Sequence, residues 1–87
     1  MAEDFNDKVI VVTGGGSGIG AACTSLFGRS GAQVAVIDRD LPGGGVPGAA
    51  LALSGDVGDA AVVTRQAEEI MARFGRIDGL VTCAGFS

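Results

Sequence analysis

The sequence predicts an α/β fold built on a parallel sheet, and its hydrophobic pattern carries this prediction. Residues 8–13 and 33–38 are short apolar runs rich in valine and isoleucine, without polar alternation, which is typical of strands buried on both faces. Elsewhere, apolar residues recur at helical spacing. Because the two kinds of element alternate along the chain, we expect parallel strands joined by right-handed crossovers.

The ends of the elements are marked by glycine, proline and charged residues. Gly31 and Gly75 stand where helices would stop, and Asp59 suits the first turn of a helix. A stretch with both prolines and four glycines predicts a loop. The expected elements are a strand at 8–13, a helix from Ile19 to before Gly31, a strand at 33–38, a loop at 39–48, a strand at 50–57, a helix at 59–74 and a strand at 77–85.

The composition of the 87 residues indicates one small domain and excludes several classes of partner. Apolar residues make up 47% and charged residues 18%, which fits a packed interior. The net charge is −4, and no basic cluster is present, so we expect neither nucleic acid nor a membrane as partner. The apolar runs are far shorter than the roughly 20 residues that span a bilayer.

The cysteine content predicts a reducing compartment. Cys23 and Cys83 are the only cysteines, they lack the spacing of metal ligands, and the chain has no histidine. We therefore expect no metal site and two buried, reduced thiols in a cytoplasmic protein, with a disulfide as the alternative.

The glycine-rich segment after the first predicted strand has the composition of a phosphate cradle. A helix that begins there would offer unpaired N–H groups and the positive end of its dipole. Gly14 is expected to make the tight turn, Gly18 to let a pyrophosphate approach, and Gly20 to let the helix pack on the strand, while Ser17 adds a hydroxyl donor. Two alanines follow Gly20 where the nucleoside-triphosphate loop needs Lys and Ser or Thr, which excludes that loop.

Asp38 suggests which dinucleotide is bound. It ends the second predicted strand eighteen residues after Gly20, near the roughly 20 expected of the acid that hydrogen-bonds ribose hydroxyls. A carboxylate there repels a 2′-phosphate, so NAD is favoured over NADP, although the adjacent Arg39 could soften this preference. The alternative interpretation of Asp38 is an ordinary charge at the end of a strand.

Three motifs, in order, resemble the short-chain dehydrogenase/reductase family. "TGGGSGIG" (13–20) is similar to its T-G-x-x-x-G-I-G fingerprint, "GDV" (55–57) to the Asp-Val pair after its third strand, and "FGRIDGLVTCAG" (74–85) to its FGRIDxLVNNAG segment. The resemblance covers essentially the whole chain. It implies part of a Rossmann-type parallel sheet, with four strands in the order 3-2-1-4 and flanking helices.

The resemblance also implies roles for single residues. Ser17 and Ile19 would contact the pyrophosphate, and Asp38 the adenosine ribose. Asp56 would accept a hydrogen bond from the adenine amino group, with the Val57 backbone beside it, and residues 83–85 would pass behind the nicotinamide ribose. The expected cofactor-binding residues are Gly14, Ser17, Gly18, Ile19, Gly20, Asp38, Asp56, Val57, Cys83, Ala84 and Gly85.

The sequence departs from the family pattern in the fourth predicted strand. Thr82 and Cys83 stand where the family has two asparagines. Neither offers the amide donors and acceptors by which those asparagines tie the central strands together.

The catalytic residues that the resemblance implies are missing. In that family a tyrosine acts as general acid/base, a lysine four residues later lowers its pKa, and a serine and an asparagine assist. The sequence has no tyrosine, and its one lysine, Lys8, stands at the very start of the first predicted strand. We assign no catalytic residue, because Asp38 and Asp56 are expected at the adenosine end.

These observations lead to one interpretation and two alternatives. Residues 1–87 are interpreted as the N-terminal dinucleotide-binding part of a single Rossmann domain whose catalytic C-terminal half is absent. The complete parent would transfer a hydride between NAD(H) and an alcohol/carbonyl substrate and would form a homo-oligomer, a tetramer or a dimer. The alternatives are a non-catalytic nucleotide-binding module and an inactive fragment that associates through its exposed fourth strand.

Overall fold

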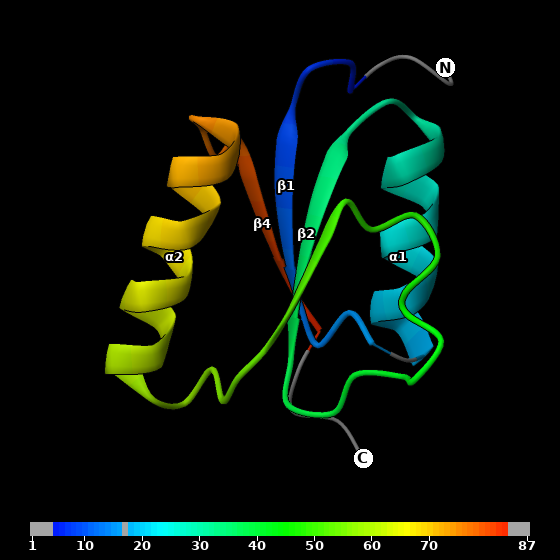
Figure 1. Cartoon of the computed structure of the whole chain (residues 1–87). Coiled ribbons are helices and arrows are strands. Elements are labelled where there is room, and N and C mark those ends of the chain that lie inside the picture. Colours follow the sequence, from blue (N-terminus) through cyan, green and yellow to red (C-terminus); the bar gives the residue numbers. More distant parts are fainter. Residues whose placement is uncertain (1–4, 17, 84–87) are drawn as a thin grey trace.

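Four parallel strands in the order β3-β2-β1-β4 form a sheet with one helix on each face (Figure 1). The computed structural model describes residues 5–16 and 18–83. The predicted α/β class, the strand order and the sequence of elements are confirmed. The elements are β1 (Val9–Thr13), α1 (Gly18–Arg29), β2 (Gln33–Asp38), β3 (Leu51–Ser54), α2 (Ala60–Phe74) and β4 (Gly79–Thr82).

The core lies on both faces of the two central strands. Every residue of β1 is buried, and so are the four inner residues of β2. Alternate residues point to opposite faces, so Val9 and Val11 join a cluster under α2, whereas Ile10 and Val12 join a cluster under α1. Burial of each such side chain stabilises the fold by about 1.5–3 kcal/mol before entropy is counted. The continuous apolar runs are therefore explained by helices on both faces.

β3 is shorter than the predicted range 50–57. It ends at Ser54, because the chain turns just beyond it. Oδ1 of Asp56 accepts a hydrogen bond from the N–H of Gly58, two residues later, at 2.8 Å, and this side-chain contact closes the turn. The turn leads directly into α2.

β4 is also shorter than the predicted range 77–85, and its ladder begins at Gly79. The preceding residue, Asp78, forms two hydrogen bonds with Val9 of β1: its backbone N–H donates to the Val9 carbonyl at 2.8 Å, and its Oδ2 accepts the Val9 N–H at 2.8 Å. A carboxylate thus occupies the place of a ladder carbonyl. Beyond β4, Cys83 still donates its N–H to the Thr13 carbonyl at 2.9 Å.

The predicted helix signals for α2 are present, with one correction. Asp59 is not in the first turn but is the N-cap, with extended backbone and a side chain that accepts from the N–H groups of Ala61 and Val62. Gly75 ends the helix at φ 81°, with its N–H bonded to the Met71 carbonyl. The cap lies outside the helix because its side chain replaces the missing backbone acceptors.

The segment between β2 and β3 is a loop, as predicted, and contains no helix. It runs beside α1 (Figure 1) and buries Val46 in the cluster on that face. Backbone of Gly48 lies against Gly28 of the helix. The loop therefore covers part of this face of the sheet, where a crossover helix would otherwise lie.

The two cysteines are free, but both are half-buried rather than buried as predicted. Partial desolvation raises the pKa of the Cys83 thiol, and the neighbouring Cys23 thiol adds to this. In the described parts of the chain, no helix is long and apolar enough to cross a membrane. Residues 5–16 and 18–83 also contain no group of three or more His, Cys, Asp or Glu side chains that could hold a metal ion.

Candidate functional site

The candidate site lies at the carboxyl ends of β1, β2 and β3, which meet at one edge of the sheet. Three short segments meet here: the glycine turn after β1, Asp38 at the end of β2 with the two residues that follow it, and Gly55–Gly58 after β3. The crevice outside the carboxyl ends of parallel strands is where open α/β sheets bind ligands. The topology thus brings together predicted site residues that are far apart in sequence.

The glycine turn is held tightly against the start of α1. Gly14 adopts φ 73° and donates its N–H to the Ile37 carbonyl at 2.7 Å. A Cβ on Gly20 would lie far closer to the Gly14 carbonyl oxygen than van der Waals contact allows, so only glycine fits where the helix crosses the turn. This geometry explains the turn and packing roles expected for these two glycines.

The outer side of the same turn is open. Gly18 adopts φ 61°, and a Cβ on it would meet no atom of the described residues within 4 Å. Ile19 is 76% exposed. The first turn of α1 contains no acidic residue, so nothing in it opposes the positive end of the helix dipole. Ser17, the expected hydroxyl donor, lies outside the described residues.

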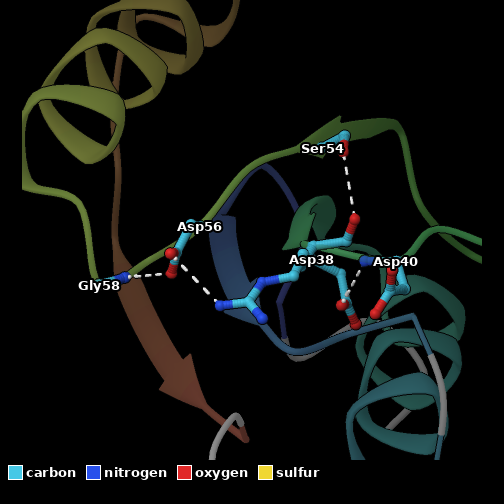
Figure 2. Close-up of polar contacts among 6 residues, drawn as sticks. Asp38, Asp40, Ser54, Asp56 and Gly58 are labelled. Carbon is cyan, nitrogen blue, oxygen red and sulfur yellow. Dashed lines mark hydrogen bonds and ion pairs between the residues drawn. The ribbon is translucent and has the colours of Figure 1, made fainter.

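Asp38 is fixed over the glycine turn by two backbone donors. Its Oδ2 accepts from the N–H of Gly16 at 2.9 Å, and its Oδ1 from the N–H of Asp40 at 3.0 Å. Figure 2 shows the second of these bonds. An ionised carboxylate has about four acceptor sites. Among the described residues, two of these sites have no partner.

Gly16 is a site residue that the sequence reasoning missed. A Cβ at this position would lie 2.8 Å from Oδ2 of Asp38. The only signal in the sequence is that Gly16 is the third glycine in an unbroken run of three. Its role becomes visible only when the acid at the end of β2 is placed above it.

Asp56 is anchored at the neighbouring strand end. Besides the Gly58 N–H, it contacts Arg39, with Nη2 3.3 Å from its Oδ2 (Figure 2). These two contacts hold the pKa of the Asp56 carboxyl below its usual range, the backbone N–H of Gly58 most strongly and the Arg39 charge next. Asp56 is therefore an anion at neutral pH.

Gln66 is a second residue that the sequence reasoning missed. This buried side chain reaches from α2 to the end of β3, where its Nε2 donates to the Ser54 carbonyl at 3.0 Å. Within the described residues its Oε1 has no hydrogen-bond partner. By tying β3 to α2, Gln66 fixes where Gly55 and Asp56 leave the sheet.

Of the remaining predicted residues, the structure describes Cys83 and Val57. Cys83 follows β4 beside the end of β1, and Ala84 and Gly85 lie outside the described residues. The Val57 side chain lines an apolar groove between α2 and β4 rather than the strand-end crevice. Its predicted contact is through the backbone, which follows Asp56 directly.

Comparison with known proteins gives the family. The family model described as short chain dehydrogenase matches residues 8–87. The chain belongs to the short-chain dehydrogenase family. Members of this family bind nicotinamide dinucleotides, NAD or NADP, and are usually oligomeric.

Relatives of this short-chain dehydrogenase sequence match nearly all of it. D-threitol dehydrogenase of Mycolicibacterium smegmatis is 44% identical over 98% of the chain, and acetoacetyl-CoA reductase of Synechocystis sp. is 43% identical over 100% of it. The structure of 3-ketoacyl-(acyl-carrier-protein) reductase from Brucella melitensis complexed with NADH superimposes on 88% of the chain, with a TM-score of 0.80 at 35% identity. The chain spans 37%, 35% and 34% of these three proteins, about a third of their length.

Proposed function

We propose that residues 1–87 are the N-terminal dinucleotide-binding part of a single Rossmann domain and that this part binds NAD. The observation that carries the proposal is the position of Asp38, whose carboxylate is held over the glycine turn by the N–H groups of Gly16 and Asp40. A phosphate cradle and an acid for sugar hydroxyls are thus joined in one rigid unit.

The parts of the coenzyme are assigned to different segments of the site. The N–H groups of residues 14–20 would hold the pyrophosphate, and the free acceptor sites of Asp38 the adenosine ribose. Asp56 and the Val57 backbone would face the adenine ring. Cys83, Ala84 and Gly85 would pass behind the nicotinamide ribose.

We further propose that the complete protein transfers a hydride between NAD(H) and an alcohol/carbonyl substrate in the cytoplasm, as a dimer or tetramer. The coenzyme supplies the hydride chemistry, and the protein supplies position and a matched acid/base. Since the sequence has no tyrosine, the proposal places that acid/base outside residues 1–87. The family's oxidoreductase members and the free cysteines support these assignments.

The preference for NAD over NADP follows from charge. The Asp38 carboxylate lies where NADP would bring a 2′-phosphate, and two like charges at close range repel each other. The Brucella relative that superimposes on this chain was solved in complex with NADH, which supports a nicotinamide dinucleotide as the ligand.

The test is calorimetric titration of the chain with NAD⁺ and with NADP⁺. We expect Asp38→Ala to weaken NAD⁺ binding by about 1–3 kcal/mol, since a carboxylate acceptor is lost. The difference in affinity between NAD⁺ and NADP⁺ should become smaller. Asp40→Ala is the matched control, because it removes an exposed carboxylate two residues away and keeps the N–H that binds Asp38. If Asp38→Ala leaves both affinities unchanged, the ribose assignment is wrong.

The outer edge of β4 favours one alternative, a fragment that associates through this strand. Among the described strands β4 pairs only with β1, and Leu80 on it is 63% exposed. Unpaired strand edges are templates for other chains. This alternative expects concentration-dependent self-association in sedimentation experiments together with silent coenzyme titrations.

A further inference from the structure

We propose that the ion pair between Arg39 and Asp56 strengthens the preference for NAD by holding the Arg39 guanidinium away from the 2′ position of the adenosine ribose. The inference rests on the proposed function, since it concerns the same coenzyme site. It gives Asp56 a second role beside the adenine contact.

The first support is the way in which Arg39 is held at both ends. Its carbonyl accepts a hydrogen bond from Oγ of Ser54 at 3.3 Å, which ties its backbone to β3. Its Nη2 lies 3.3 Å from Oδ2 of Asp56. Asp56 is itself fixed by the Gly58 N–H, so the side chain of Arg39 is drawn toward an anchored anion.

The second support is that Asp38 takes no part in this pair. Its two described partners are the N–H groups of Gly16 and Asp40, and Figure 2 shows Asp38 beside Asp40 and Asp56 beside Gly58 as two separate carboxylates. Among the described residues, Arg39 forms an ion pair with Asp56 alone. Arg39 therefore follows Asp38 in the sequence, but its side chain pairs with Asp56.

The chemistry of arginine makes this orientation matter. An arginine near the strand-end acid accommodates the 2′-phosphate in proteins that bind NADP, and a guanidinium matches phosphate oxygens with two parallel hydrogen bonds. While Asp56 holds it, Arg39 contributes less to a phosphate beside Asp38. Loss of the Asp56 charge would release it.

The exposure of the pair sets the size of the effect. The side chains are 72% and 52% exposed, so water screens their attraction and the pair is weak. The lowered pKa of Asp56 keeps it charged throughout the neutral range. The pair therefore biases coenzyme choice without fixing it.

The experiment measures the ratio of the dissociation constants of NADP⁺ and NAD⁺ by calorimetry on the chain. We expect Asp56→Asn to lower this ratio by about three- to fivefold, the size of one exposed ion pair. The adenine contact is common to both coenzymes, so its loss cancels in the ratio. Asparagine also keeps an oxygen for the Gly58 N–H.

Two further variants show whether Arg39 is responsible. In Arg39→Ala/Asp56→Asn the released cation is gone, so we expect the ratio to return to that of Arg39→Ala alone. Glu69→Gln removes another exposed carboxylate, on α2, and should leave the ratio unchanged. Circular dichroism of each variant checks the fold.

The outcomes separate this inference from the proposed function. If the wild-type chain binds NAD⁺ but Asp56→Asn leaves the ratio unchanged, the inference is overturned and the proposed function stands. A ratio lowered equally with and without Arg39 overturns it too, because charge removal alone would then be the cause. If the wild-type chain binds neither coenzyme, both fail together.

Discussion

The two central strands and the two outer strands of the sheet differ in how completely they are packed. β1 and β2 are buried along nearly their whole length, whereas β3 and β4 alternate between half-buried and exposed residues. The glycine turn and Asp38 follow the two buried strands. The geometry of the proposed coenzyme site therefore rests on the best-packed part of the molecule.

The contrast is sharpest on the face covered by α2. Near β2 this face is closed by Ile70, which is 1% exposed, but toward β4 it opens into an apolar groove that reaches Leu80. Leu80 is paired in register with the buried Val11 of β1 and still faces solvent. Packing against a helix, rather than strand pairing, thus decides which side chains stabilise the sheet.

We expect the greatest loss of stability from a substitution in the glycine turn, next to the well-packed central strands. Gly20→Ala places a methyl group against the Gly14 carbonyl, and we expect it to lower the free energy of unfolding by about 3 kcal/mol or more, because backbone cannot yield as a side chain can. Gly43→Ala is the control and should be nearly neutral, because an added Cβ there would meet no atom of the described residues within 4 Å. Urea denaturation followed by circular dichroism makes the measurement, and equal midpoints for the two variants would contradict this view of the turn.

Smaller losses of stability are expected from truncating one apolar side chain in a central strand and one in an outer strand. Val36→Ala in β2, at 0% exposure, should cost about 2–3 kcal/mol of unfolding free energy through lost burial and the cavity left behind. Leu80→Ala in β4 removes more atoms but should cost less than about 0.5 kcal/mol, as exposed substitutions usually do. Denaturant unfolding of both variants ranks them. If Leu80→Ala costs as much as Val36→Ala, the outer strand is as well packed as the inner one.

The smallest expected effect concerns the junction of β4 with β1. The Asp78 carboxylate accepts hydrogen bonds from Arg76 and from the Val9 N–H, and these contacts, that of Arg76 first, hold its pKa below the usual range. A carboxyl whose pKa is lowered by folding stabilises the folded state above its unfolded pKa, and this stabilisation disappears as pH falls through the folded value. Asp78→Asn should therefore lower the thermal midpoint at pH 7, and the difference from wild type should shrink below about pH 4.

Thermal melts of Asp78→Asn between pH 2 and pH 7, on the order of one unit apart, test this expectation. Glu69→Gln is the matched control, since it neutralises an exposed carboxylate and should show no comparable pH dependence. A deficit of Asp78→Asn that stays constant across this range would mean that its hydrogen-bond geometry, and not its charge, holds the two strands.

The sequence predicted the central strands and both helices, because unbroken valine-rich runs and glycine stops are local signals. The strand order was predicted from the family resemblance and not from local pattern. The sequence overestimated the lengths of β3 and β4. Asp56 closes a turn after β3, and the Asp78 carboxylate takes the place of a backbone acceptor before β4, and the local sequence pattern does not reveal either contact. The contacts of Gly16 with Asp38 and of Arg39 with Asp56 join residues on different strand ends. Such contacts depend on topology, so periodicity could not reveal them.

In the proposed function, the amides of the glycine turn hold a dinucleotide whose adenosine ribose contacts Asp38. The most direct measurement is titration of the ¹⁵N-labelled chain with NAD⁺, followed by the backbone amide resonances. We predict shifts concentrated at Gly14, Gly16, residues 18–20 and Asp38, with the outer surface of α2 unaffected. An absence of shifts at millimolar NAD⁺, or shifts confined to the groove beside Leu80, would contradict the claim.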